Sequence, residues 1–311
     1  MFGSGPGALP SDARTLRIDP MTQRDRQDEA LGVIIRLLNG EERFDYTSEW
    51  FELHEAALQI LPLQEKMPMT TASSISPSGM KIAGKYGIGV LSIASNSTEG
   101  LLALPTQWSF AEESAAQHGT RVDRRDWRVL TSFHLAETEE QARNEAVDGL
   151  QRWNNEYNNR ILGRPNTPWV DDKWELLDQV TGRNGGAAGA TVIGTPDQMV
   201  AAVRELQKVT GGFGVLLGFA HDWANREEML RSWDLFARYV IPELNGYTRP
   251  MWESGEYLVK HQQELMAGAG AAIIAQIQRD PRAAEAFAVT VAQGQRPAPG
   301  ASATAGAALR E

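Results

Sequence analysis

Short apolar segments alternate with helical patterns along the first 245 residues, and this alternation restricts the fold more than any other feature of the chain. Apolar segments with no polar interruption are typical of strands that are buried on both faces of a parallel sheet, with helices covering that sheet. The sequence therefore predicts an α/β protein built from parallel βα units. The expected strands are residues 67–72, 89–94, 127–136 and 213–220.

Apolar residues that recur every three or four positions predict the helices between these strands. The expected helices are residues 22–39, 77–86, 105–118, 138–160, 195–209 and 227–244. A small hairpin is expected at residues 44–46 and 50–53, where aromatic side chains cluster. Thr195 and Gln198 have the spacing of a capping box at the start of their helix.

Two stretches fit neither pattern. Residues 162–189 form an irregular insertion, and an insertion of this length inside a domain is typical of a functional loop or lid. From about Pro281 the chain consists mainly of Ala, Gly, Pro and Ser, a composition that predicts a disordered tail. We therefore expect a sheet-containing domain over residues 1–260, followed by a C-terminal helix and low-complexity tail over residues 261–311.

The overall charge and the lack of cysteine exclude several classes of protein. A formal net charge of −10 argues against a protein that binds the phosphate backbone of nucleic acids. Without cysteine there is no disulfide, thiolate metal site or cysteine nucleophile. The N-terminus lacks the basic and apolar regions of a signal peptide, and no run of about 18 apolar residues could span a membrane. We expect a soluble, cytoplasmic protein.

Polar side chains follow the expected strands at their carboxyl ends, which is where parallel α/β folds bind ligands. Ser74 and Ser95 follow the first two strands, His134 lies near the end of the third, and His221 and Trp223 follow the fourth. His134 is either a pocket histidine or a hydrogen-bonded core histidine. His221 could exchange protons near neutral pH, and Trp223 could form a pocket wall. The alternative is a plain loop in which Asp222 caps the next helix.

The serine-rich turn at residues 73–79 allows two interpretations that do not exclude each other. Ser76 with Pro77 is typical of a helix start, with Ser76 as the N-terminal cap. The free N–H groups of that helix end, with the hydroxyl of Ser78 and the small Gly79, would equally hold a phosphate. The glycine-rich segment around Gly5 is either a second phosphate-contacting loop or a flexible tail.

No other catalytic motif is present. The five histidines lack metal-ligand spacing, so no metal site is expected. The GxSxG elbow of a serine hydrolase and the nucleotide fingerprints are also absent in their proper context.

Several motifs in order resemble the luciferase-like flavin-dependent monooxygenases, the group that includes bacterial luciferase and the limonene-monooxygenase type. They are GSGPGALPSDA (3–13), the strand–serine–helix unit around Ser76, VIGTPDQM (192–199) and the segment GFGVLLGFAHDWANREEMLRSWDLFARYVIPEL (212–244). The resemblance implies a TIM (β/α)8 barrel. In that family three βα units precede the glycine-rich turn that opens this chain. We therefore expect an N-terminally truncated barrel that keeps only the end of strand four and the whole of strands five to eight.

The resemblance also implies an activity. Reduced FMN from an NAD(P)H:flavin reductase would react with O2 and oxygenate a small hydrophobic substrate, in a homo- or heterodimer. Two alternatives are a deazaflavin (F420)-dependent oxidoreductase of the same fold and a truncated non-catalytic subunit. The cofactor-binding residues would be Ser74, Ser76, Ser78, Gly79 and Gly5. The catalytic residue is not identified, with His134 and His221 as candidates, and Trp223 and Ser95 would line the substrate pocket.

Overall fold

A six-stranded sheet in which every strand pair is parallel organises residues 1–245. The computed structural model describes residues 1–93, 98–164, 167–183 and 191–292. The strands of this sheet are β1 (Phe2–Ser4), β4 (Met69–Ser73), β5 (Gly89–Ser92), β6 (Trp127–Leu135), β7 (Thr191–Gly194) and β8 (Val215–Phe219). The longest strand, β6, pairs with β5 near its start, with β8 along its middle and with β7 near its end.

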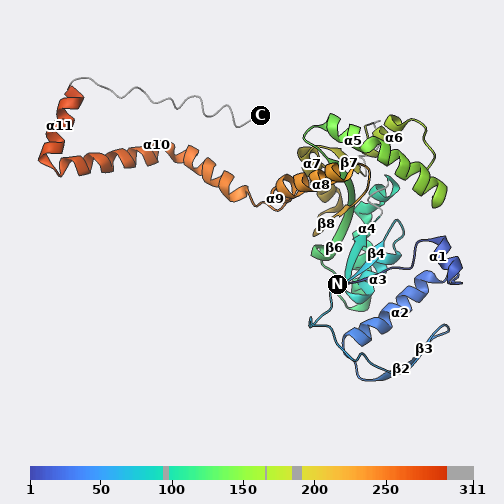
Figure 1. The fold of residues 1–311 in the computed structure, drawn as a ribbon. Coiled ribbons are helices and arrows are strands. Elements are labelled where there is room, and N and C mark those ends of the chain that lie inside the picture. Colours follow the sequence, from blue (N-terminus) through green and yellow to red (C-terminus); the bar gives the residue numbers. More distant parts are fainter. Residues whose placement is uncertain (94–97, 165–166, 184–190, 293–311) are drawn as a thin grey trace. The chain divides into compact units, whose positions relative to one another are not determined.

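Helices cover this sheet, as the apolar character of its strands predicts. They are α1 (Pro10–Thr15), α2 (Gln23–Leu38), α3 (Ser78–Tyr86), α4 (Thr98–His118), α5 (Glu139–Arg152), α6 (Lys173–Thr181), α7 (Pro196–Thr210), α8 (Arg226–Leu235) and α9 (Ile241–Leu244). Turns of π-helix extend α5 over Trp153–Ile161 and α8 over Phe236–Val240. The antiparallel hairpin of β2 (Phe44–Thr47) and β3 (Glu52–Ala56) lies beside α2 (Figure 1).

Alternation along β6 separates a packing face from a polar face. Trp127, Val129 and Phe133 point into apolar clusters formed with the covering helices. Trp127 stacks on Trp108 of α4 with ring centroids 5.1 Å apart. Ser132 and His134, in the alternate positions, are buried polar residues. The strand therefore places two polar side chains on one face close to its carboxyl end.

Several expectations are confirmed and others are wrong. Strand, helix and hairpin positions mostly agree within a few residues, but α4 begins at Thr98 rather than at Pro105. The elements β1, α1 and β7 were not expected. The insertion at 162–189 contains a regular helix, α6, whose start is capped by the Asp172 carboxylate. The segment after Pro281 is helical over α11 (Pro281–Ala292), where alanine favours helix and Asp280 accepts hydrogen bonds from the first N–H groups.

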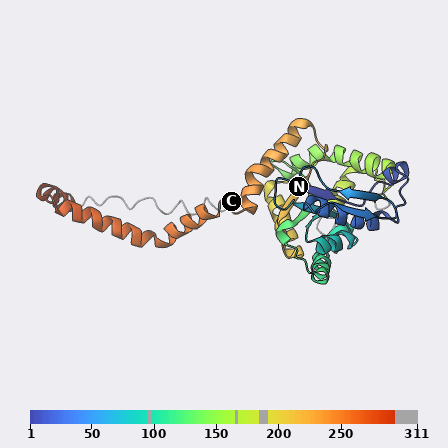
Figure 2. The ribbon, with the colours of Figure 1, turned by 90° about the horizontal axis from the view of Figure 1, so that it is seen from below.

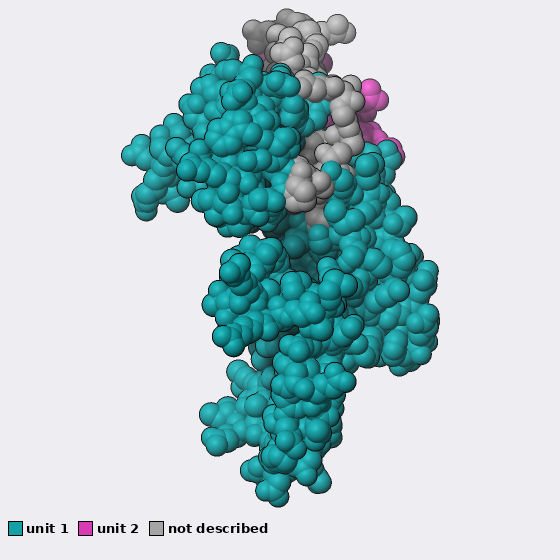
Figure 3. Space-filling view, turned by 90° about the vertical axis from the view of Figure 1, so that its right-hand side faces the viewer, with its two compact units in different colours: residues 1–245 teal, residues 246–311 magenta. Residues whose placement is uncertain are grey.

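The resemblance to a TIM barrel is supported by the parallel βα order. The described strands form an open sheet in the order β1-β4-β5-β6-β7, with β8 off this path and paired with β6. The truncated barrel stays a prediction. Figure 3 shows that the surface of residues 1–245 is hollowed on the face in view.

Residues 246–311 form a second unit. Its described part consists of α10 (Arg249–Gln278) and α11, drawn from orange to red in Figure 2. The boundary expected near residue 260 lies inside α10, and it stays a prediction. None of the described helices combines the length and apolar character that crossing a membrane requires.

Candidate functional site

The carboxyl ends of parallel strands meet at one edge of a sheet, and this edge gathers most of the expected site residues. Ser74 follows β4, His134 is the second-last residue of β6, and His221 lies shortly after β8. In the sheet, β5 separates β4 from β6. The site therefore has two groups of residues, a serine turn on one side of β5 and a histidine group on the other.

His221 is the centre of a buried aromatic group. Its ring stacks on Trp223 with centroids 4.0 Å apart and planes 6° apart. Phe219 and Trp153 approach the same ring at 4.3 and 4.9 Å. The Nε2 atom of His221 lies 2.9 Å from the Oγ atom of Ser132. The structure thus brings together two expected site residues, His221 and Trp223, and joins them to β6.

Burial lowers the pKa of His221 to about 4, and the opposing charge of Asp222 does not offset this effect. The imidazole is therefore neutral at pH 7. Trp223 is also buried, with its Nε1 atom enclosed and without a hydrogen-bond partner among the described residues. Asp222 does not cap the following helix, because Asn225 and Glu228 form the capping box there.

His134 belongs to a buried charged network. Its Nε2 atom lies 2.8 Å from Oε2 of Glu145 on α5, and Arg231 of α8 binds the other oxygen of the same carboxylate. Gln141 donates a further hydrogen bond to Glu145 at 2.8 Å. Burial alone would raise the pKa of Glu145, but the hydrogen bonds from His134 and Gln141 and the charge of Arg231 lower it below its ordinary value. Glu145 is thus a carboxylate, which only accepts hydrogen bonds, so Nε2 of His134 carries a proton.

His134 therefore has the hydrogen-bond partner that the core interpretation requires, and its role as a pocket or catalytic histidine stays a prediction. Its Nδ1 atom is nevertheless enclosed and has no partner among the described residues. Buried polar atoms are usually satisfied, so this nitrogen is a place where a ligand or water atom would be stabilised.

The serine turn is open. Ser74 and Ser76 are exposed, and Ser78 is half-buried. The interpretation of Ser76 as the N-terminal cap is wrong: Pro77 occupies that position, and α3 has no side-chain cap. The Ser76 hydroxyl instead lies 2.9 Å from that of Ser78. The first N–H groups of α3 consequently lack a capping side chain.

Gly79 allows α3 to start close to β4. A Cβ atom at this position would lie 2.9 Å from the Cα of Ser73 and even closer to the carbonyl oxygen of Ala72. Gly5 also lies near the end of β4, because its Cβ atom would meet that of Ala72 at 3.5 Å. Both glycines therefore flank the same strand end. The glycine-rich segment is not wholly a flexible tail, since Phe2–Ser4 pairs with β4.

The remaining expectations are less informative. Ser95 lies outside the described residues. The capping box of Thr195 and Gln198 is confirmed. Over residues 1–93, 98–164, 167–183 and 191–292, no three His, Asp or Glu side chains are grouped to hold a metal ion.

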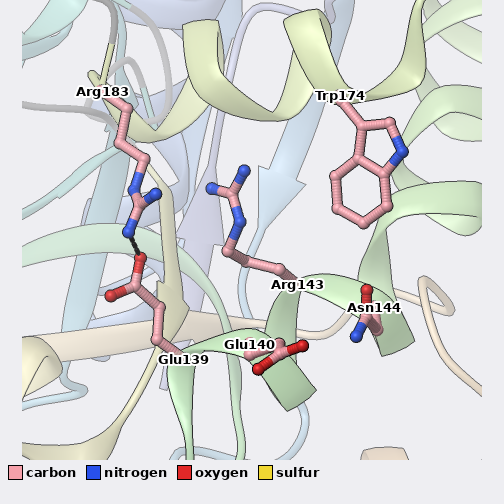
Figure 4. Close-up of a pocket in the computed structure, with 6 residues that line it drawn as sticks. All are labelled: Glu139, Glu140, Arg143, Asn144, Trp174 and Arg183. Atoms are coloured by element: carbon pink, nitrogen blue, oxygen red, sulfur yellow. Dashed lines mark hydrogen bonds and ion pairs between the residues drawn. The ribbon is translucent and has the colours of Figure 1, made fainter.

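A separate pocket of about 350 Å³ lies between the start of α5 and helix α6 (Figure 4). Arg143 and Arg183 enter it from opposite elements, and Trp174 forms one wall. Both cations are already paired, Arg143 with Asp178 at 2.7 Å and Arg183 with Glu139. The pocket contains none of the expected site residues, and we assign it no ligand.

Comparison with known proteins identifies the family. The sequence model of the luciferase-like monooxygenases matches residues 1–212. The chain belongs to the luciferase-like monooxygenase family. It is 43% identical over 248 residues to 4-hydroxyprotoasukamycin monooxygenase from Streptomyces nodosus subsp. asukaensis, covering 79% of this chain and 65% of that protein. It is 41% identical over 250 residues to limonene 1,2-monooxygenase from Rhodococcus erythropolis, covering 80% of this chain and 62% of that protein. The chain thus spans less than two thirds of each curated relative.

Solved structures share the fold of this luciferase-like chain. Monooxygenase RslO1 from Streptomyces bottropensis superposes with a TM-score of 0.62 at 22% identity, covering 78% of this chain and 68% of its own. The oxygenating constituent of 3,6-diketocamphane monooxygenase from Pseudomonas putida, solved in complex with FMN, gives 0.59 at 21% identity, covering 77% and 70%. An F420-dependent secondary alcohol dehydrogenase gives 0.52 at 16% identity, covering 76% and 67%.

Sequence reasoning missed Ser132, Glu145 and Arg231. For Glu145 a signal was available, because it lies among Ala142, Ala146 and Gly149 on the apolar face of α5. A carboxylate on the buried face of an amphipathic helix requires a partner. For Ser132 and Arg231 no comparable local signal exists, since their partners are distant in sequence.

Proposed function

We propose that this chain is a flavin-dependent monooxygenase that uses reduced FMN and O2 to oxygenate a small hydrophobic organic substrate. Both curated relatives are monooxygenases by name, and one of the similar folds is an FMN complex. The observation that carries the proposal is the serine turn. It presents exposed hydroxyls in front of an uncapped helix end, at the edge of the sheet where parallel α/β proteins bind ligands.

The residues of this turn fit a phosphate. Ser76 and Ser78 lie close enough to share one anion, as the 2.9 Å between their hydroxyl oxygens indicates. Gly79 keeps the helix end close to β4, and Ser74 and Gly5 flank the strand end. No acidic side chain occurs in residues 69–79, so no carboxylate of the turn would repel the anion. Ser74, Ser76, Ser78, Gly79 and Gly5 would hold the FMN phosphate.

Bound FMN, once reduced, would supply the electrons that activate O2. The chain's own residues would position the cofactor and the substrate and shield them from water. His221 stays neutral and is fixed by Ser132 and Trp223, so it can accept or donate one hydrogen bond without adding a charge to the pocket. Phe219 is 38% exposed, and it offers an aromatic face next to His221 for a hydrophobic substrate. Trp223 would support the pocket through its stacking on His221, and Ser95 remains a candidate on the substrate side.

Two partners follow from this proposal. A separate NAD(P)H:flavin reductase would deliver the reduced flavin, as the resemblance to the flavin-dependent monooxygenases implies. The protein would act as a homo- or heterodimer.

A second candidate is an F420-dependent oxidoreductase that transfers hydride without oxygen. It is supported by similar folds described as F420-dependent, an alcohol dehydrogenase and a tetrahydromethanopterin reductase from Methanopyrus kandleri. Curated relatives at more than 40% identity are monooxygenases by name, which favours FMN.

Binding of FMN and of riboflavin, which lacks the phosphate, tests the site. We expect FMN to bind more tightly than riboflavin by about tenfold or more, and Ser76→Ala with Ser78→Ala to remove most of this difference. Ser109→Ala, an exposed serine on α4, serves as the control and should leave both affinities unchanged. Equal binding of FMN and riboflavin by the unaltered chain would contradict the phosphate site. Preference for F420 would support the second candidate, and absence of binding to either cofactor would indicate a non-catalytic subunit.

A further inference from the structure

Gln107 of α4 is a buried residue whose amide reaches the serine turn from a different helix. It is only 3% exposed. Its Nε2 atom donates a hydrogen bond to the carbonyl oxygen of Ile75 at 2.9 Å, and its Oε1 atom accepts one from the hydroxyl of Ser73 at 3.4 Å. A backbone carbonyl only accepts hydrogen bonds, so the amide nitrogen faces Ile75 and the amide oxygen faces Ser73. One side chain therefore connects the end of β4 to the middle of the turn.

The helix that carries Gln107 is itself packed closely against α3. A Cβ atom at Gly84 of α3 would collide with the backbone of Ala111, so the two helices meet there without room for a side chain. Beside this contact, the Ser114 hydroxyl donates a hydrogen bond of 2.7 Å to the carbonyl oxygen of Lys81. Residues 107, 111 and 114 share one face of α4, because they are spaced by four and three positions. Gln107 thus extends the contact between the two helices to the turn that precedes α3.

The serine turn benefits from such support because much of it is exposed. Ser74, Ile75 and Ser76 are all exposed, and α3 has no side-chain cap. An exposed segment loses conformational freedom when it binds a ligand, and this loss weakens binding. The hydrogen bonds from Gln107 already restrict the turn in the absence of a ligand. Less freedom therefore remains to be lost when a ligand binds.

We propose that Gln107 is a positioning residue for the phosphate of the cofactor. It acts through Ser73 and Ile75, and it holds Ser74 and Ser76, the neighbours of Ile75, at the start of α3. This inference rests on the proposed FMN site, to which it adds a residue 32 positions beyond Ile75 in the sequence. The consequence is selectivity: binding of FMN depends on Gln107, whereas binding of riboflavin, which has no phosphate, does not.

Gln107→Met removes both hydrogen bonds and keeps a side chain of similar length. We expect it to lower the ratio of FMN affinity to riboflavin affinity by about fivefold or more, with the affinity for riboflavin itself unchanged. Flavin fluorescence measures both affinities. Ser114→Ala removes a hydrogen bond between the same two helices but none to the turn, so it controls for a general loss of stability and should keep the ratio. Gln117→Met, at an exposed position of α4, should also keep it.

Proteolysis without any cofactor gives a second readout. Thermolysin cleaves before large apolar residues, and the bond between Ser74 and Ile75 lies in the exposed part of the turn. We expect this bond to be cut about fivefold or more faster in Gln107→Met than in the unaltered chain, and at an unchanged rate in Gln117→Met. Fragment masses identify the bond. If Gln107→Met does not fold, Ser73→Ala removes one of the two hydrogen bonds and should change both readouts in the same direction.

The results distinguish this inference from the proposed function. An unaltered chain that binds FMN and riboflavin equally would contradict the phosphate site, and the role of Gln107 with it. A selective unaltered chain whose selectivity or cleavage rate is unchanged by Gln107→Met would overturn only the role of Gln107. A loss of selectivity in Ser114→Ala as large as that in Gln107→Met would also overturn it, because the effect would then be one of stability alone.

Discussion

The imidazole of His221 lies flat on the indole of Trp223, 4.0 Å away, and its Nε2 atom lies 2.9 Å from Ser132 on the neighbouring strand. One histidine thereby joins the end of β8 to the middle of the sheet. Burial withdraws the ring from water and disfavours its protonated form, and the low pKa of His221 follows from this cost.

The pKa of His221 predicts how stability depends on pH. The pKa is about 4 in the folded chain and near 6.5 when unfolded, so the unfolded state binds the proton first as pH falls. The contribution of neutral His221 is complete above pH 6.5 and is lost progressively between pH 6.5 and 4. Urea unfolding over this range measures it. His221→Phe should flatten the slope, and an unchanged slope in this variant would contradict the assignment.

The hydrogen bond between His221 and Ser132 is expected to stabilise the fold. Ser132→Ala leaves the buried Nε2 atom without this partner and should lower the free energy of unfolding by about 1–2 kcal/mol. Ser109→Ala, on the exposed side of α4, should change it by less than about 0.5 kcal/mol. Equal effects of the two substitutions would show that the buried contact adds nothing.

Two glutamates that approach Arg231 provide a matched comparison. Glu145 is mostly buried and also binds His134, whereas Glu137 is exposed and lies 3.6 Å from the Nε atom of Arg231. Glu145→Gln should lower the free energy of unfolding by about 2–3 kcal/mol, because Arg231 loses its buried counter-charge. Glu137→Gln should cost less than about 1 kcal/mol, as exposed ion pairs do. Chemical denaturation of both variants distinguishes these values, and a larger loss from Glu137→Gln would refute the network.

Gly79 is expected to tolerate no side chain. In Gly79→Ala the new Cβ collides with the backbone of Ala72 and Ser73, so α3 must shift away from β4 and the free energy of unfolding should fall by about 2 kcal/mol or more. FMN binding should weaken in parallel, since the serine turn moves with the helix end. Gly268→Ala is the control, because its Cβ meets nothing and alanine favours helix. Calorimetry of both variants measures the contrast; a harmless Gly79→Ala would mean that the close approach is unimportant.

Local sequence determined the elements and much of their chemistry. Short, largely apolar runs indicated β4, β5, β6 and β8, and Thr195 with Gln198 indicated the start of α7, because periodicity and capping act over a few residues. The order of motifs also identified the family. The polar residues at the carboxyl ends of the strands drew attention to His134 and His221, since parallel strands share one direction; their role in catalysis stays a prediction.

Tertiary structure alone decided what those residues contact. Ser132 is 89 positions from His221, and Arg231 is 86 positions from Glu145. No local pattern encodes such pairs, because their separation in space is set by how β6, β8 and the covering helices pack. The same holds for Ser76, which has the spacing of a helix cap but loses that role to Pro77 once Gly79 brings α3 against β4. Backbone propensity is a short-range property, whereas burial and pairing depend on the packed sheet.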